Sequence, residues 1–186
     1  MGGAGFDLEL HFEGLELCGS VLEDPSRLEE LLSSWRTLAR ELVLEELEGS
    51  PLGSMGPRAL EASVVFLARD EMAEMNARYR GKEGPTDVLS FPTLEWGLFD
   101  LAQGFEGLGE EPLPLGDVFI CPEVARENAL SGGTSTEREL TLLLIHGLCH
   151  LLGHDHDEPE REARMWAVQG KYMERFLRGS GGVSDA

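Results

Sequence analysis

The amino-acid sequence predicts one α+β domain of four strands and about five helices, with a metal site on a buried C-terminal helix. Its 186 residues suffice for one domain with a sizeable core, and a hydrophobic content of 41% with a charged content of 27% is ordinary for a globular protein. Short segments have strand-like alternation or β-branched and aromatic residues, while longer segments repeat apolar residues at helical spacing.

The first two predicted elements are a half-buried strand and a long amphipathic helix. Residues 6–12 alternate strictly between apolar and polar side chains, as a strand with one buried face does. That apolar face consists of Phe6, Leu8, Leu10 and Phe12. A helix is expected to begin at Asp24, with Pro25 in its first turn. Its apolar stripe consists of Leu28, Leu31, Leu32, Trp35, Leu38 and Leu42.

The middle of the chain predicts two further strands around a short helix. Residues 49–57 have the glycine, proline and serine content of a loop. A strand rich in Val, Phe and Leu is predicted over residues 59–68, followed by a helix from a capping Asp70 to about Ala77. A Gly/Pro loop then leads into a short strand over residues 88–91.

The next segment, Thr93 to Pro114, is acidic, rich in glycine and carries three large aromatic residues. We predict a mobile insertion there, whose aromatic side chains cover a cleft. A buried strand is expected over residues 116–121. Pro122 opens a helix that runs to about Leu130 and is ended by a pair of glycines.

Two helices complete the predicted domain. The first carries the metal site and is capped by Thr134 or Thr136, each of which has a glutamate three residues later. The last helix starts near Pro159 and buries a stripe made of Met165, Val168, Tyr172 and Phe176. Residues 1–178 are thus expected to form a single domain, and the Gly/Ser tail 179–186 is expected to be disordered.

The metal site is predicted from residues 146–156, which read HGLCHLLGHDH. His146 and His150 are four residues apart, so on a helix both imidazoles lie on one face and can share an ion. Gly153 suits a helix C-terminus that needs a positive φ, and the turn can bring His156 in as a third ligand. Three histidines leave one tetrahedral position open, as in catalytic zinc sites.

Other residues of this motif leave alternatives open. The spacing matches that of long-motif zinc peptidases, but Gly147 stands where those enzymes carry their general-base glutamate. Cys149 could close a structural site, although a small buried thiol is the simpler interpretation. His154 is either a fourth ligand or proton shuttle, or an exposed neutral histidine on a turn. Asp155 either orients a ligand imidazole or stabilises the turn.

Charge restricts the binding partners of the protein, and cysteine content indicates its compartment. The formal charge of −20 disfavours general binding to polyanions, but Arg78, Arg80 and Lys82 form a local basic cluster where one could engage. No run approaches the roughly 18 apolar residues of a membrane span, and the N-terminus lacks a signal-peptide pattern. Three sparse cysteines indicate reduced thiols, so a cytoplasmic protein is expected.

Three separated motifs resemble the YbeY family of bacterial rRNA maturation factors. They are residues 76–92, which read NARYRGKEGPTDVLSFP, residues 115–120, which read LGDVFI, and the histidine motif 146–156. They occur in the family's order, and the resemblance covers about residues 58–176. Residues 1–57 match only in their strand-then-helix layout.

The resemblance implies a mixed four-stranded sheet and a metal-dependent, single-strand-specific endoribonuclease. It implies maturation of rRNA, including 16S rRNA 3′-end processing, and ribosome quality control. One Zn²⁺ would be held by His146, His150 and His156, and Arg80 would be the functionally important arginine. The partners implied are precursor rRNA and the ribosome or small-subunit assembly proteins, with no role for DNA or a membrane.

Two other hypotheses remain open from the sequence. A zinc hydrolase could act on another substrate, although Gly147 counts against peptides. Alternatively, the zinc could merely hold the C-terminal helices together in a non-catalytic ribosome-assembly factor. Arg80 separates these ideas, because a scaffold should tolerate its loss and a nuclease should not.

Overall fold

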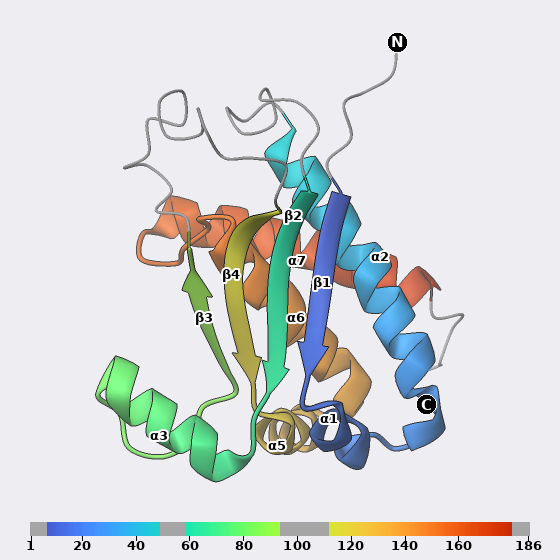
Figure 1. Cartoon of the computed structure of the whole chain (residues 1–186), viewed down its shortest axis with the longest axis vertical. Helices are drawn as coiled ribbons and strands as arrows, with labels where there is room; N and C mark the ends of the chain where they lie inside the picture. The colour runs from blue at the N-terminus through green and yellow to red at the C-terminus, as the bar shows by residue number, and fades with distance from the viewer. Residues whose placement is uncertain (1–6, 49–58, 94–111, 180–186) are drawn as a thin grey trace.

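The centre of the fold is a four-stranded mixed sheet, described by a computed structural model that covers residues 7–48, 59–93 and 112–179. Its strands are β1 (Asp7–Glu13), β2 (Ala59–Phe66), β3 (Val88–Pro92) and β4 (Leu113–Ile120), arranged in the order β1-β2-β4-β3 (Figure 1). The first three in that order are parallel, and β3 runs antiparallel to β4 along one edge. The predicted mixed four-stranded sheet is confirmed.

Six α-helices and one 3-10 turn lie within the described residues. They are α1 (Leu15–Val21), α2 (Leu28–Leu47), α3 (Arg69–Arg80), α5 (Pro122–Gly132), α6 (Thr136–Leu151), α7 (Pro159–Gly179) and the turn η1 (Pro25–Arg27). The sequence analysis missed α1, which is only seven residues long. This helix starts after Gly14, whose φ of 71° brings it so near β2 that a Cβ atom would lie 2.3 Å from the carbonyl oxygen of Phe66.

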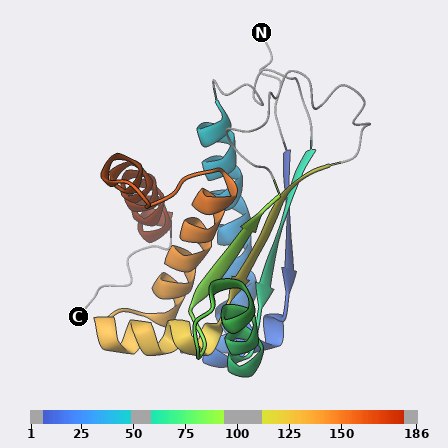
Figure 2. The ribbon, with the colours of Figure 1, turned by 90° about the vertical axis from the view of Figure 1, so that its left-hand side faces the viewer.

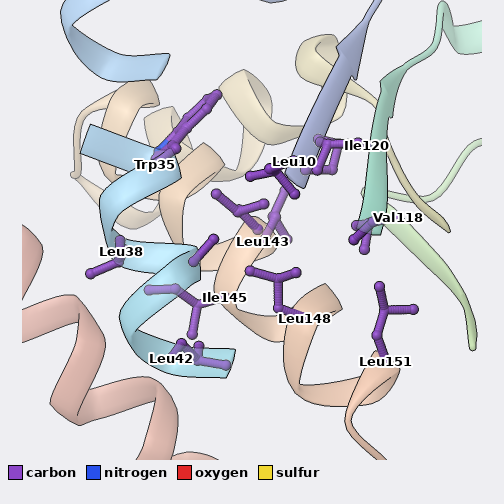
Figure 3. Close-up of a cluster of buried hydrophobic side chains, with 14 of the residues drawn as sticks. Leu10, Trp35, Leu38, Leu42, Val118, Ile120, Leu143, Ile145, Leu148 and Leu151 are labelled. Carbon is purple, nitrogen blue, oxygen red and sulfur yellow. The ribbon is translucent and has the colours of Figure 1, made fainter. Parts of the chain in front are cut away.

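The main core lies between the sheet and a layer of helices on one of its faces. Figure 2 shows α6 between the sheet and α7, with α2 on the same side. Side chains from α2, α6 and the strands meet there, among them Trp35, Val118 and Leu148 (Figure 3). The buried Trp35 also donates a hydrogen bond from Nε1 to Oγ1 of Thr141, 2.8 Å away, which ties α2 to α6. Helix α6, which carries His146 and His150, is therefore largely buried, as predicted.

A smaller cluster on the opposite face positions α3. Met72 of α3 packs there with Leu89 of β3 and with Cys121. Asp70 does not cap this helix, contrary to the prediction, because Ala68 occupies the N-cap and its N–H is accepted by the Glu71 carboxylate at 3.1 Å. The helix also continues three residues past the predicted end, so Arg80 lies in its last turn.

Several other predicted boundaries move. The first long helix begins at Leu28 and not at Asp24, because Asp24 caps the 3-10 turn η1 by accepting the Ser26 N–H. Strand β2 ends at Phe66, two residues before the predicted end. Strand β4 begins at Leu113, so it takes the last residues assigned to the insertion.

Ser135 caps α6 by accepting from the Arg138 N–H at 3.2 Å. The predicted caps Thr134 and Thr136 do not occupy the N-cap position of α6, and the Thr136 hydroxyl donates a hydrogen bond to the Glu23 carboxylate instead.

Helix α7 includes Gly179, one residue of the predicted tail. The buried stripe of α7 is as predicted. The remaining tail, the 49–57 loop and residues 94–111 of the predicted insertion lie outside the described residues. No helix in the described ranges combines the length and the apolar character that crossing a bilayer requires.

Candidate metal centre

Helix α6 presents two histidines side by side in its C-terminal half. His146 and His150 are half-buried, and their Nε2 atoms are 3.1 Å apart. The residues around them on the helix, including Ile145, Leu148 and Cys149, are buried in the core. Because the core fixes the rotation of α6, both imidazoles are held on the face that is not fully buried.

The chain reverses directly after this helix. Gly153 has a φ of 83°, and its N–H bonds to the carbonyl oxygen of His150 at 3.0 Å. The N–H of His154 bonds to the carbonyl oxygen of Cys149, also at 3.0 Å. These paired bonds form a Schellman motif, which satisfies the last carbonyls of the helix and turns the chain back. The predicted glycine turn is thus present.

The turn brings His156 to the helix. Its ring centroid lies 6.0 Å from that of His146 and 5.3 Å from that of His150. One ring nitrogen from each of the three histidines falls within 4.8 Å of the others. Two nitrogens bound to a tetrahedral zinc ion lie about 3.4 Å apart, so the group fits one ion after a small inward movement of His156. The three histidines could therefore hold a metal ion.

The electrostatics of the helical pair favour a metal over a proton. Burial lowers the pKa of His146, and the charge of His156 adds to this effect. Burial, followed by the neighbouring His146 and His156, lowers the pKa of His150 to about 4. Both rings are therefore neutral near pH 7, as a metal ligand must be.

Cys149 does not fit the closed four-ligand alternative. The metal-binding group found in the described ranges consists of the three histidines without this cysteine. Burial raises the pKa of the Cys149 thiol to about 12, so it stays protonated, whereas a zinc ligand must be a thiolate. Its side chain belongs to the hydrophobic core. The arrangement is that of an open site.

His154 is neither exposed nor one of the gathered histidines. Its side chain is only 10% exposed, and Nε2 lies 2.8 Å from Oε2 of Glu46, itself 17% exposed, on α2. The expectation of an exposed histidine on a turn is wrong, because α2 covers this side of the motif. Asp155 accepts the N–H of His156 at 2.8 Å, so it stabilises the turn. Met165 is fully buried in the core.

Gly147 allows α6 to lie very close to the sheet. A Cβ atom at this position would be 2.4 Å from Cγ1 of Val118 on β4. A peptidase-type glutamate could not occupy this position without displacing the helix. A glycine at position 147 therefore lets α6 pack closely on β4, and it also means that the general base of the peptidases is absent.

Two residues missed by the sequence analysis adjoin His146. The Gln169 side chain on α7 is placed to accept a hydrogen bond from this histidine and raises its pKa, and the Gln169 Nε2 is buried with no hydrogen-bond partner in the described structure. The negative charge of Asp87 opposes the lowering of the His146 pKa, and its carboxylate accepts the Val88 N–H at 2.8 Å. Asp87 lies within the 76–92 motif, but neither that motif nor any pattern around Gln169 connects these residues with the histidines, because both reach the site through the tertiary fold.

Arg80 lies near the histidines at the end of α3. The last turn of this helix lies outside the β3 edge of the sheet (Figures 1 and 2). The Arg80 side chain is exposed, and its charge contributes to lowering the pKa of His146. None of the ion pairs among the described residues involves Arg80. Arg78 instead lies over the Tyr79 ring, 5.3 Å from its centroid.

Comparison with known proteins places this fold and motif in context. The sequence model described as Endoribonuclease YbeY matches residues 27–177. A protein named Endoribonuclease YbeY from Salinispora tropica is 48% identical over 124 residues, which cover 66% of this chain and 78% of that protein. One of the same name from Beutenbergia cavernae is 41% identical over 157 residues, covering 84% and 95%. The solution structure of a Thermotoga maritima protein shares the fold, with a TM-score of 0.55, 24% identity and coverage of 92% and 91%.

Proposed function

The chain belongs to the YbeY endoribonuclease family, and we propose that it is a zinc-dependent endoribonuclease that cuts single-stranded RNA. Its substrate would be precursor rRNA, in 16S rRNA 3′-end processing and in ribosome quality control. The observation that carries the proposal is an open three-histidine group next to an arginine without an ion pair among the described residues.

His146, His150 and His156 would hold one zinc ion. Two of them come from a buried helix and the third from a turn with paired hydrogen bonds, so little rearrangement is needed on binding. When bound, zinc would polarise a phosphoryl oxygen and make water more acidic. The fourth position, which Cys149 leaves open, would be available to the substrate.

Arg80 would stabilise the charge that develops on the phosphate. Phosphodiester cleavage builds negative charge on phosphoryl oxygens, and a planar guanidinium can donate two parallel hydrogen bonds to them. The side chain is exposed, and its charge reaches His146. Arg78 and Lys82, exposed on either side of it in the chain, would contact the RNA backbone.

A non-RNA substrate is less well supported. A peptidase of this motif needs a glutamate at position 147, and the close contact of Gly147 with Val118 leaves no space for one. The donors around the histidines, a guanidinium and an amide, suit an anionic substrate. Phosphodiesters match that chemistry.

The charge of the chain favours docking on a larger assembly. At a formal charge of −20 the protein repels RNA except near its local basic cluster. We infer that the ribosome or small-subunit assembly proteins supply much of the affinity, in the cytoplasm, where the three buried cysteines stay reduced. We also infer that residues 1–178 act as one domain.

The test is cleavage of a single-stranded RNA that carries the 16S rRNA 3′ end, by zinc-loaded wild type, His150→Ala and Arg80→Ala protein. We expect wild type to cut, His150→Ala to lose zinc and activity, and Arg80→Ala to keep zinc and fold but lose at least tenfold in rate. Arg36→Ala is the matched control, because Arg36 lies over Phe12 at 5.1 Å in another part of the molecule. Equal cutting by all four proteins would indicate a contaminating nuclease and favour the non-catalytic assembly factor.

A further inference from the structure

The two sides of helix α7 have different partners. On one side, Lys171 and Arg175 form ion pairs with Glu45 of α2, and Arg175 also contacts Glu41 at 3.1 Å. On the other side of its buried stripe lies Gln169, whose side-chain Nε2 is buried and whose side chain acts on the pKa of His146. The side of α7 that faces away from α2 is therefore the side that borders the metal centre.

Trp166 lies on this second side. It is three residues from Gln169, hence about 60° away around the helix axis and about one turn nearer the helix start. Its neighbour Met165 is fully buried, but Trp166 is 65% exposed. The contrast with Trp35 is sharp, because that indole is fully buried and hydrogen-bonded.

The exposed indole also lacks a partner. In the described part of the chain, the ring–ring and cation–ring contacts involve other side chains and leave Trp166 out. Tyr79, the other large exposed aromatic residue of the described chain, packs edge-on against Phe91 at 4.9 Å, and the Arg78 guanidinium lies over its ring. Of these two residues, only Trp166 has no such contact within the described chain, and it is also the more exposed.

We propose that Trp166 is a stacking subsite for one nucleobase of single-stranded RNA, next to the three histidines. The proposal rests on the proposed endoribonuclease function. A strand could then place its phosphate at the histidines and a flanking base on the indole.

Because the protein is strongly acidic, base stacking would contribute a large share of its affinity for RNA. Single strands are usually held by a basic groove together with aromatic platforms. With a formal charge of −20, this chain gains little from phosphate contacts outside its basic cluster. Base stacking needs no positive charge and is possible only for unpaired bases. An indole beside the metal would therefore add affinity and select single strands.

The test measures binding of a labelled, single-stranded 2′-O-methyl RNA of about twelve nucleotides to the zinc-loaded full chain by fluorescence anisotropy. A gel of the recovered probe checks that it stays intact. We expect Trp166→Ala to weaken binding roughly five- to a hundredfold and Trp166→Phe to recover most of the loss. Leu130→Ala, which removes another exposed apolar side chain on α5, is the matched control and should bind as wild type does.

A scan with abasic nucleotides separates stacking from a structural role. At one probe position, removal of the base should weaken wild-type binding but leave Trp166→Ala binding unchanged. Zinc content should be equal in all variants. A loss that is the same at every abasic position, or a Trp166→Ala protein that binds like wild type, would overturn the subsite.

Two further outcomes are distinguishable. If wild type cuts and binds RNA but Trp166→Ala loses only association with ribosomal particles, the indole is a protein-docking residue and the subsite is wrong. If zinc-loaded wild type neither binds nor cuts single-stranded RNA, the proposed function itself fails, and the subsite with it.

Discussion

Helix α6 and strand β4 touch at Gly147 and Val118, where a Cβ atom on the glycine would lie 2.4 Å from Cγ1 and 2.9 Å from Cγ2 of the valine. This contact lies one residue after the first metal-site histidine. The spacing between helix and sheet thus sets the depth of His146 beside the sheet. A side chain at position 147 must therefore displace either Val118 or helix α6, and a shift of α6 would carry His146 and His150 with it.

We predict that Gly147→Ala destabilises the protein by about 1–3 kcal/mol, the usual cost of overpacking. Gly170→Ala on α7 is the matched control, because a Cβ atom there meets nothing within 4 Å. This control should gain about 0.5–1 kcal/mol from helix propensity. Urea unfolding of the zinc-free proteins measures both changes.

A second variant tests the mechanism of that loss. Val118→Ala removes both methyl groups that the new Cβ atom of Gly147→Ala would meet. The loss of unfolding free energy in the double variant should therefore be about 1 kcal/mol smaller than the sum of the losses in the two single variants. Strictly additive effects would mean that the helix shifts freely and that the contact does not restrict position 147.

We also predict that the Glu46–His154 pair holds the metal turn in place. Their side chains meet at 2.8 Å and join α2 to the turn that delivers His156. Glu46→Ala leaves a nearly buried imidazole without its acceptor, which should cost about 1–3 kcal/mol of stability. Zinc affinity should fall severalfold, because a looser turn must be ordered on binding.

Glu41→Ala is the control for that prediction. Glu41 is an exposed residue of α2, and its partner Arg175 keeps a second contact with Glu45. An exposed pair of this kind contributes less than about 1 kcal/mol, so both stability and zinc affinity should change little. Competition with a chromophoric chelator measures the zinc affinity. Equal zinc affinities for Glu46→Ala and Glu41→Ala would mean that Glu46 does not hold the turn that carries His156.

The sequence predicted the parts of the site that depend on local chain geometry. The face shared by His146 and His150 follows from helical spacing, and the reversal before His156 follows from the conformational freedom of Gly153. Contacts between distant segments could not be predicted this way. His154 seemed exposed because its partner Glu46 is 108 residues away in the chain.

Local rules also failed where several residues compete for one role. Asp70 and Thr136 are good capping residues, yet Ala68 and Ser135 occupy the N-caps. The packing of α3 and α6 fixes where each helix starts. The polar side chains near each start then form hydrogen bonds with whichever groups lie close to them. Glu71 caps α3 from inside the helix, which replaces the cap that Ala68 cannot provide.

We predict that the zinc-free protein loses stability on mild acidification. The pKa of His150 is lowered to about 4, chiefly by burial, whereas the unfolded chain has an ordinary histidine pKa of 6.5. Between these values the unfolded state binds a proton that the folded state does not, so stability falls as the pH falls. The loss from His150 should be on the order of 2–3 kcal/mol.

His150→Gln isolates this effect from the carboxylates. The variant lacks the titrating ring, so its free energy of unfolding should be flatter than that of wild type between pH 6.5 and 4.5. The lowered pKa of His146 adds a slope of the same sign in both proteins. Urea titrations at several pH values, with a chelator present, give the difference. Parallel curves would mean that His150 titrates normally in the folded protein.

Gln169 should affect zinc binding and stability in opposite ways. Its side chain is placed to accept a hydrogen bond from His146 and raises the pKa of that ring. A contact of this kind orients a ligand imidazole, and its loss typically weakens metal binding 10- to 100-fold. Its Nε2 is buried without a partner in the described structure, so removing the amide relieves a cost. Gln169→Leu should therefore bind zinc about 10- to 100-fold more weakly, while the zinc-free protein stays as stable as wild type or gains stability.

Gln169→Glu provides the comparison, since it keeps an oxygen that can accept from His146. It should bind zinc at least as tightly as wild type, because a carboxylate makes the imidazole a better ligand. Chelator competition and thermal unfolding of the zinc-free proteins measure the two quantities separately. If Gln169→Leu and Gln169→Glu bound zinc equally, the hydrogen bond would not orient His146, and α7 would contribute only packing to the metal centre.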